Sequence, residues 1–353
     1  MMNPIIIALI LVSSIGLFRP SVVWGASAPE ILAAGVKLHE AGKLKEAIRA
    51  YDRVIKADPK FSDAYYNRGN AYFDLGENVR ALSDYNAVLR LNPDDSDALF
   101  YRGNTYRRLR KDDLAIKDYT VAIKIKPDDP KSYVNRGDIH FHANRYDLAI
   151  KDYSEAIRLD PKNPDNYYNR GNVLLSLNKK ADAIKDYDKA ISLDDKFTES
   201  YYNRGVARND SEEYENAIQD FSEVLKLNPN SAHAFYNRAL AKAKLGRYEA
   251  AIDDFGEAIR IDPKDPEAPF NRGLAYLKSE KYDYAAKDFS EVIRIQPNNA
   301  DAHVYRGVLR IYQNKDKDAD ADFKKAFKIN PELKKKIQPI IDEAREKVQG
   351  TSK

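Results

Sequence analysis

The chain of 353 residues has no cysteine, which excludes disulfide bonds, thiol catalysis and cysteine metal sites. It has almost no net charge: 58 Lys and Arg against 55 Asp and Glu leave +3, so no overall field attracts nucleic acid or acidic membranes. Its longest apolar run, Ile5 to Phe18, is shorter than the roughly 20 residues of a membrane-spanning helix. The composition therefore predicts neither nucleic-acid binding nor a stable membrane span.

Histidine is also scarce, and its five copies predict no metal site. They are His39, His140, His142, His233 and His303. The closest pair is two residues apart, which on a helix turns the two side chains about 200° away from each other. The sequence has no glycine-rich phosphate loop and no nucleophile elbow. It therefore predicts a protein without catalytic residues, metal ion or cofactor, and so no enzyme.

Residues 1–25 differ in composition from the rest of the chain and are predicted to be a signal peptide. Their apolar run has the length of a signal-peptide core. The small residues Val23 and Gly25 suit the positions before a cleavage site, so the mature chain is expected to begin at Ala26. The protein is then exported, either periplasmic or secreted. The alternatives are an uncleaved membrane anchor and a buried first helix.

The rest of the chain is a repeat of 34 residues that runs from 28 to 333 without an insertion. Repeats 1 to 9 are 28–61, 62–95, 96–129, 130–163, 164–197, 198–231, 232–265, 266–299 and 300–333. Position 20 is alanine in every repeat, and position 32 is proline in every repeat except repeat 5, which has Asp195. Position 24 is always aromatic: Tyr51, Tyr85, Tyr119, Tyr153, Tyr187, Phe221, Phe255, Phe289 and Phe323. A fixed period of this length indicates one unit stacked many times.

A small residue, an aromatic residue and a terminal proline at this spacing resemble the tetratricopeptide repeat, over most of the chain. The resemblance implies an all-α fold, a right-handed superhelical solenoid of helix–turn–helix repeats. We expect a first helix at about positions 2–14 of each repeat and a second at about positions 17–30, which the proline at position 32 ends.

The chain after the last repeat is expected to cover its apolar side, as solenoid ends require. Residues 334–349 are predicted to form a C-terminal capping helix, and residues 350–353 a disordered tail. The apolar face of the capping helix is made of Ile337, Ile340, Ile341, Ala344 and Val348.

Arginine at position 7 and aspartate at position 23 occur together in repeats 2–9, whereas repeat 1 has Ala34 and Ala50 there. The pairs are Arg68 and Asp84, Arg102 and Asp118, Arg136 and Asp152, Arg170 and Asp186, Arg204 and Asp220, Arg238 and Asp254, Arg272 and Asp288, and Arg306 and Asp322. No repeat has one member alone, and position 7 falls on the stripe of the first helix expected to be buried. An unpaired guanidinium there would be costly. We therefore predict structural ion pairs between the two helices of a repeat.

The opposite stripe of the first helix carries aromatic and amide side chains. In the tetratricopeptide family this stripe lines the concave surface where partners bind, which makes the following residues a predicted partner-binding groove. They are Tyr66, Asn67, Asn70, Phe100, Asn104, Asn135, Asp138, Tyr168, Asn169, Asn172, Tyr202, Asn203, Tyr236, Asn237, Phe270 and Asn271. Amides can both donate to and accept from a peptide backbone. The alternative, which can hold at the same time, is that the rings pack between repeats and the amides bond local backbone.

Position 2 is acidic in six repeats: Asp63, Asp97, Asp165, Glu199, Glu267 and Asp301. Carboxylates in a first turn favour the helix dipole, and they also form an acidic groove edge suited to basic segments. The basic clamp with which some members of the family bind a C-terminal carboxylate is absent here. The sequence thus predicts a scaffold that binds extended peptide segments or partner proteins. The alternative is a solenoid that binds envelope polysaccharide.

Overall fold

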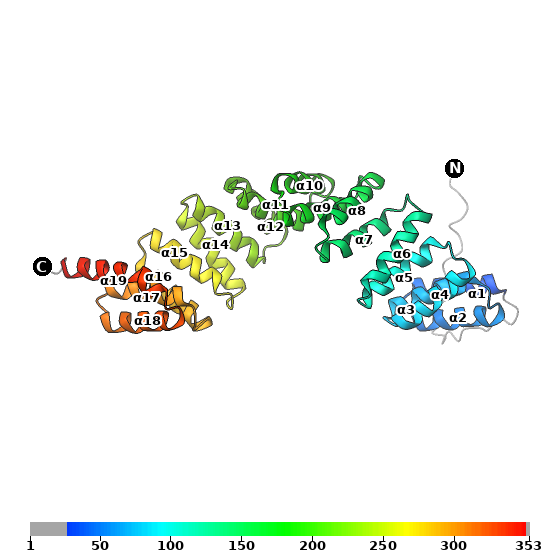
Figure 1. The fold of residues 1–353 in the computed structure, drawn as a ribbon, viewed down its shortest axis with the longest axis horizontal. Coiled ribbons are helices and arrows are strands. Elements are labelled where there is room, and N and C mark those ends of the chain that lie inside the picture. Colours follow the sequence, from blue (N-terminus) through cyan, green and yellow to red (C-terminus); the bar gives the residue numbers. More distant parts are fainter. Residues whose placement is uncertain (1–26, 351–353) are drawn as a thin grey trace, which may run out of the picture. The chain divides into compact units, whose positions relative to one another are not determined.

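The computed structural model describes residues 27–350, which form 19 helices. The predicted signal peptide and residues 351–353 lie outside the described residues. The chain divides after Pro127 into two compact units. Figure 1 labels the helices.

Unit 1, up to Pro127, contains the six helices of repeats 1–3. They are α1 (Ala28–Glu40), α2 (Leu44–Ala57), α3 (Ser62–Asp74), α4 (Asn78–Leu91), α5 (Ser96–Arg108) and α6 (Asp112–Ile125). In each repeat the two helices pack against each other, and the second helix packs against the first helix of the next repeat. The unit is therefore a stack of helix pairs.

Unit 2, from Asp128, contains repeats 4–9 and one further helix. The helices of repeats 4–6 are α7 (Pro130–His142), α8 (Tyr146–Leu159), α9 (Pro164–Ser176), α10 (Lys180–Leu193), α11 (Thr198–Asp210) and α12 (Tyr214–Leu227). Those that follow are α13 (Ala232–Lys244), α14 (Tyr248–Ile261), α15 (Glu267–Lys278), α16 (Tyr282–Ile295), α17 (Ala300–Tyr312), α18 (Asp316–Ile329) and α19 (Leu333–Gly350). The described residues thus form an all-α helical repeat solenoid.

The first helix of most repeats occupies positions 1–13, one residue earlier than expected. Five of these helices begin after a residue whose side chain accepts a hydrogen bond from a backbone N–H of the first turn. These N-caps are Asp95, Asp129, Asn163, Ser231 and Asn299, all at position 34. Because a capping side chain satisfies an N–H that has no partner within the helix, it determines where the helix begins.

The turn between the two helices has a left-handed residue at position 15 in every repeat. Only repeats 1, 2 and 7 have glycine there, with φ between 72° and 77°. The other repeats have Arg110, Asn144, Asn178, Glu212, Glu280 and Asn314, with φ between 56° and 63°. The backbone N–H of the next residue bonds back to position 11, as from Glu77 to Tyr72 at 2.8 Å, which closes the helix with a Schellman-type turn.

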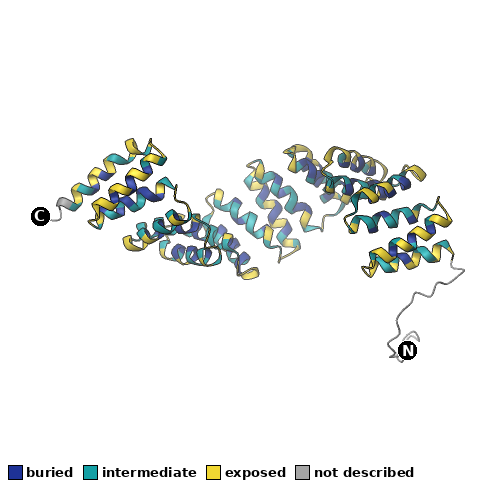
Figure 2. Cartoon of the chain, turned by 90° about the horizontal axis from the view of Figure 1, so that it is seen from below, coloured by how far each residue is buried: buried dark blue, intermediate teal, exposed yellow. Residues whose placement is uncertain are grey.

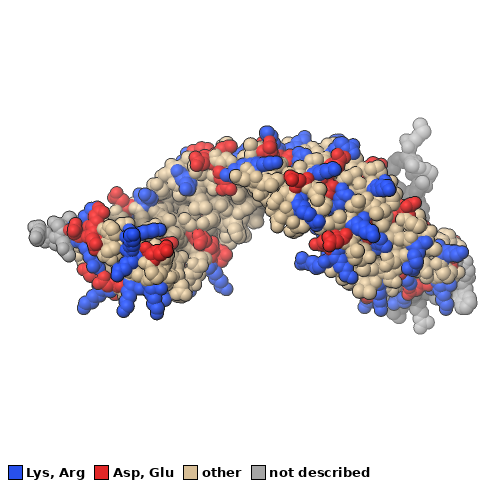
Figure 3. Space-filling model, in the orientation of Figure 1, with Lys and Arg blue, Asp and Glu red and all other residues tan. Residues whose placement is uncertain are grey.

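The core of each unit follows positions 20 and 24. Every alanine at position 20 is fully buried, and no aromatic ring at position 24 is more than 4% exposed. The glycine at position 8 lets the first helix approach this ring: a Cβ on Gly103 would lie 2.7 Å from Cε1 of Tyr119. Buried residues consequently lie where neighbouring helices meet (Figure 2), and charges of both signs mix on the visible surface (Figure 3).

Helix α19 covers the end of unit 2 by packing against α17 and α18. Its Ile341 and Ala344 are buried with Phe323, and Ile337 and Val348 pack beside them. Ile340, expected on the same face, is instead 48% exposed. Among the helices of residues 27–350, none has both the length and the apolar content needed to cross a membrane.

Candidate functional site

In both units the first helices of consecutive repeats touch one another. Contacts join α1 to α3 and α3 to α5 in unit 1, and α9 to α11, α11 to α13 and α13 to α15 in unit 2. Among the described helices, second helices of consecutive repeats make no contact of similar extent. The first helices therefore lie on the inner side of each stack, and their exposed residues form its inner surface.

The arginines at position 7 bind the aspartates of their own repeats through two parallel hydrogen bonds. In repeat 2, Nε and Nη2 of Arg68 donate to the two carboxylate oxygens of Asp84 at 2.8 and 2.7 Å. The same bidentate contact occurs in repeats 3–9. The eight aspartates are 2–6% exposed. The hydrogen bonds to Asp84 raise the pKa of Arg68 above its ordinary value, although burial opposes this. The contact joins the two helices of a repeat, so these residues serve the fold.

The third nitrogen of the same guanidinium reaches the preceding repeat, a contact that the sequence analysis missed. Nη1 of Arg204 donates to Asp188 at 2.6 Å, and Nη1 of Arg238 to Ser222 at 3.0 Å. These partners occupy position 25, where Asp52, Asn86, Ser154 and Ser290 receive equivalent bonds. The polar residue that recurs at position 25 is the sequence pattern that could have indicated it. Each such arginine thus ties its repeat to the one before it.

Position 11 supplies a second cation to the buried aspartate in several repeats. Arg208, Lys242 and Arg310 contact Asp220, Asp254 and Asp322 at 2.8, 2.6 and 2.6 Å. Burial alone would raise the pKa of Asp322, but hydrogen bonds from Arg306 and His303 hold it below its usual value. In repeats 2, 3 and 8, position 11 is instead a tyrosine whose ring faces the guanidinium of position 7.

Repeat 4 has His140 at position 11, and its side chain is 9% exposed. Its Nε2 lies 4.0 Å from Oδ2 of Asp152, and its Nδ1 has no hydrogen-bond partner. Burial lowers the pKa of His140 by more than Asp152 raises it. The described part of the chain holds no group of three or more His, Cys, Asp or Glu side chains that could bind a metal ion.

All sixteen residues of the predicted groove are half-buried. The six aromatic rings among them, at position 5, pack against the position 24 rings of their own repeats, with centroids 5.6–6.4 Å apart. All six contacts are edge-to-face or tilted. The rings therefore contribute to the core with one side, and their binding surface is smaller than the sequence suggested.

The residues predicted at position 9 accept hydrogen bonds from buried tyrosines. The hydroxyls of Tyr85, Tyr119, Tyr153 and Tyr187 donate to Asn70, Asn104, Asp138 and Asn172 at 2.6–2.8 Å. In repeats 6–9 position 24 is phenylalanine, and it packs instead against an aliphatic residue at position 9: Val206, Leu240, Leu274 and Val308. The position 9 polar groups thus match the hydroxyl beneath them, a role that the sequence analysis did not consider.

Three amides at position 6 link consecutive repeats. Nδ2 of Asn203, Asn237 and Asn271 donates to the hydroxyls of Tyr168, Tyr202 and Tyr236 in the preceding repeats at 3.3, 3.0 and 3.1 Å. Nδ2 of Asn237 and Asn271 also bonds backbone carbonyls of its own helix. These contacts form a ladder of alternating tyrosine and asparagine across α9, α11, α13 and α15, which we call the Tyr–Asn ladder. The side chains predicted to line the groove are therefore also the ones that make contacts between repeats.

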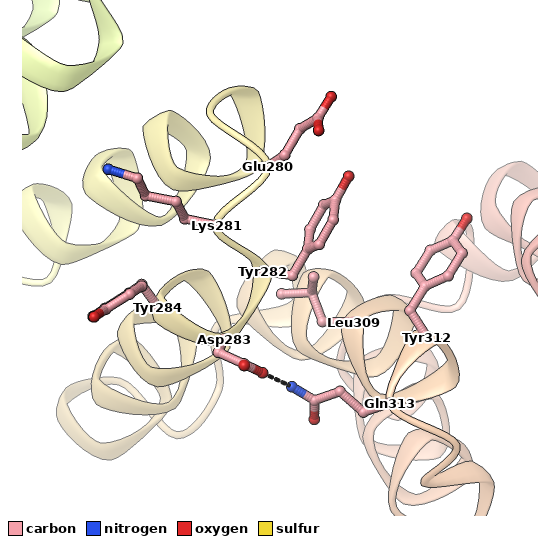
Figure 4. A pocket seen from close by; sticks show the side chains of 8 residues that line it. All are labelled: Glu280, Lys281, Tyr282, Asp283, Tyr284, Leu309, Tyr312 and Gln313. Carbon is pink, nitrogen blue, oxygen red and sulfur yellow. Dashed lines mark hydrogen bonds between the residues drawn. The ribbon is translucent and has the colours of Figure 1, made fainter.

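A hollow of about 490 Å³ opens beside this ladder in unit 2. It is lined by His233 and Tyr236 of α13, by Asp262, Lys264 and Asp265 between α14 and α15, and by Glu267 of α15, together with Ala232 and Ala258. Position 2 and position 5 side chains therefore share one concave surface. A second hollow of about 340 Å³ lies between the start of α16 and the end of α17, where Asp283 accepts a hydrogen bond from Gln313 at 2.8 Å (Figure 4).

Family models match this chain in several places. The model described as "TPR repeat" matches residues 35–76, 137–178 and 241–280. Models described as "Tetratricopeptide repeat" match 62–95, 97–129, 164–197, 198–231 and 266–299. Together they cover more than half of the chain. No curated protein shows a significant match.

Many solved structures resemble the chain, among them the following three. A tetratricopeptide repeat protein from Parabacteroides merdae is 24% identical over 71% of this chain and 97% of its own, with a TM-score of 0.50. The C-terminal part of a TPR repeat-containing protein from Cytophaga hutchinsonii is 17% identical over 77% of this chain and 97% of its own, with a TM-score of 0.52. YrrB, described as a TPR protein with an unusual peptide-binding site, is 28% identical over 51% of this chain and 92% of its own, with a TM-score of 0.46. The first two share the fold of this chain.

Proposed function

Because the chain belongs to the tetratricopeptide repeat family, whose members bind protein or peptide partners, we propose that it is a non-enzymatic scaffold. Its inner surface binds an extended segment of a partner protein. The family is typically non-enzymatic.

The observation that carries this proposal is the Tyr–Asn ladder. Its side chains are held by hydrogen bonds between repeats, as from Asn237 to Tyr202 at 3.0 Å, so their positions are set before a partner arrives. Preorganised groups lose little side-chain entropy on binding. The half-buried rings still offer apolar surface along consecutive first helices, which suits a chain that runs along the stack.

Charge supports a basic segment as the partner. Position 2 presents exposed carboxylates on the inner side of unit 2, at Asp165, Glu199, Glu267 and Asp301. Glu267 lines the same hollow as Tyr236 of the ladder. A Lys or Arg in the partner can pair with these carboxylates while its neighbours contact the rings, and such surface charge acts mainly on specificity and association rate.

We place this binding outside the cytoplasm, because residues 1–25 have the pattern of a signal peptide. The intact mass of the protein from its native host tests this. Cleavage before Ala26 is expected, and a full-length cytosolic species contradicts export.

Site-specific photocrosslinking tests the groove itself. A benzophenone amino acid replaces Glu199, exposed on α11 of the inner side, or Lys189, exposed on the second helix α10, in the native host. The inner position is expected to give protease-sensitive adducts and the outer position none. Adducts only from Lys189 contradict the proposed surface, and adducts sensitive to glycosidase alone indicate a polysaccharide ligand.

A further inference from the structure

The inner wall of unit 2 changes its chemistry along the chain. Position 9 is polar in repeats 4 and 5, at Asp138 and Asn172, but aliphatic in repeats 6–9. The change accompanies the replacement of tyrosine by phenylalanine at position 24, because a phenylalanine needs no acceptor. A partner that follows this wall therefore meets a polar stretch first and an apolar stretch towards α19.

The apolar stretch ends in a pocket of about 310 Å³ where the capping helix meets the last repeats. Four helices line it, and the residues used below are Leu277 of α15, Tyr282 of α16, Val308 and Tyr312 of α17, and Ile340 of α19. A pocket of this size lies at the small end of ligand sites. It fits one large side chain better than a cofactor or a second helix.

Three large apolar side chains are exposed at the rim of this pocket. Tyr282, Tyr312 and Ile340 are 48%, 47% and 48% exposed. Tyr282 and Tyr312 extend in the same direction (Figure 4). Exposed apolar residues that gather around one hollow are typical of interaction sites, whereas single ones are ordinary. Ile340 belongs to the apolar face of α19 but is not among the residues of that helix that pack against repeat 9. It lines the pocket instead.

The charge beside the pocket indicates which kind of partner residue lies next to the apolar side chain. Among the described residues that line the pocket, Asp301 is the only one with a charged side chain. It is exposed, and it belongs to the same acidic row at position 2 as Glu267 and Glu199. A partner with a cationic residue beside its apolar side chain satisfies both features.

We propose that this pocket is an anchor site of the scaffold, which binds one large apolar side chain of the partner segment next to a Lys or Arg that pairs with Asp301. The proposal rests on the proposed function and adds the chemistry of the recognised segment. The anchor restricts where a segment can begin or end on the inner surface, because α19, the last of the described helices, forms one wall of the pocket.

The probe is N-acetyl-4-fluorophenylalanyl-lysine amide, titrated against the mature chain and followed by ¹⁹F NMR. We expect saturable binding that weakens at least tenfold in Val308→Phe, which fills the pocket, and severalfold in Ile340→Ser. Matched controls are Leu148→Phe and Val79→Ser, both at exposed aliphatic residues of second helices; both retain binding. Replacing the lysine of the probe with glutamate weakens binding about threefold, as expected for a partly exposed ion pair.

Equal binding to the native chain, Val308→Phe and Ile340→Ser overturns the proposal, as does the absence of binding to the native chain. Ile340→Ser keeps the test valid if Val308→Phe does not fold. A native dimer that Ile340→Ser converts to a monomer, without probe binding, shows that a second copy covers the pocket and also overturns it. Crosslinking at Glu199 separates the two proposals: adducts there with no probe binding leave the groove intact and refute the anchor alone.

Discussion

The hydroxyl of Tyr187 donates a hydrogen bond to Oδ1 of Asn172 at 2.8 Å, from the second helix of repeat 5 to its first. The same relationship joins positions 24 and 9 in repeats 2–5, and it disappears in repeats 6–9, where phenylalanine faces an aliphatic residue. Repeat 1 breaks the rule, because Tyr51 packs against Val36 and its hydroxyl has no partner. Burial raises the pKa of Tyr51 to about 12.

Replacing Tyr51 with phenylalanine is therefore expected to stabilise the protein by about 1 kcal/mol, because it removes a buried hydroxyl without a partner. The matched control, Tyr187→Phe, removes a hydroxyl that is bonded to Asn172 and should destabilise by a similar amount. Urea unfolding followed by circular dichroism measures both. If the two substitutions shift the urea midpoint in the same direction, the need of the tyrosine hydroxyl for a hydrogen-bond acceptor does not explain why tyrosine at position 24 occurs with a polar residue at position 9.

Replacing Asp186 with alanine leaves Arg170 without its bidentate partner and should cost about 3 kcal/mol. The double variant Arg170→Ala with Asp186→Ala reproduces the alanines of repeat 1. It should cost clearly less than the sum of the two single changes, because neither charge is then left unpaired. Thermal melting of the three variants checks this. Strict additivity would mean that the two residues act independently.

Glycine should be favoured over glutamate at position 15 of repeat 6. Glu212 has φ +63°, and the left-handed region costs a residue with a side chain about 1 kcal/mol. Glu212→Gly is therefore expected to stabilise by several tenths of a kcal/mol, less than the full strain because glycine also makes the unfolded chain more flexible.

The reverse change in repeat 7, Gly246→Ala, should destabilise, since φ there is +73° and a Cβ would have nothing within 4 Å to pack against. The melting temperatures of Glu212→Gly and Gly246→Ala, each compared with that of the native protein, test the two expectations. A stabilised Gly246→Ala would show that backbone strain is unimportant at this turn.

Acid should weaken repeat 4 through His140. Its folded pKa is lowered from 6.5, so the unfolded chain takes up a proton more readily. The stabilising contribution of the neutral side chain is complete above pH 6.5 and falls as the pH drops from there towards the folded pKa. The charged groups that act on it are Asp152, Arg145 and Arg136.

The variant His140→Leu, which copies Leu174 at the same position of repeat 5, should remove this part of the pH dependence. The melting temperature of His140→Leu minus that of the native protein should therefore increase as the pH is lowered from 7 to 5. The exposed His233→Gln serves as control and should show no such trend. A constant difference across this pH range for His140→Leu contradicts the assignment.

The repeat itself could be predicted from the sequence because its evidence is local and recurs nine times. Alanine at position 20, an aromatic residue at position 24 and proline at position 32 determine how two helices of one repeat meet. The same internal comparison links Arg170 with Asp186, since both belong to one repeat and neither occurs alone in any other. The position 34 caps, such as Asn163, are also visible in the sequence and indicate first helices that begin at the next residue.

Contacts between repeats needed the tertiary structure. The bonds from Arg204 to Asp188 and from Asn203 to Tyr168 depend on how one repeat stacks on the next, an angle and a distance that no period in the sequence encodes. For this reason the sequence could not decide whether the ladder residues were exposed or packed. The pocket at Ile340 was equally hidden, because α19 is not a repeat and has no second copy with which to compare it. What the sequence alone determined is the unit and its internal pairing; the stacking of units decided which side chains remain for a partner.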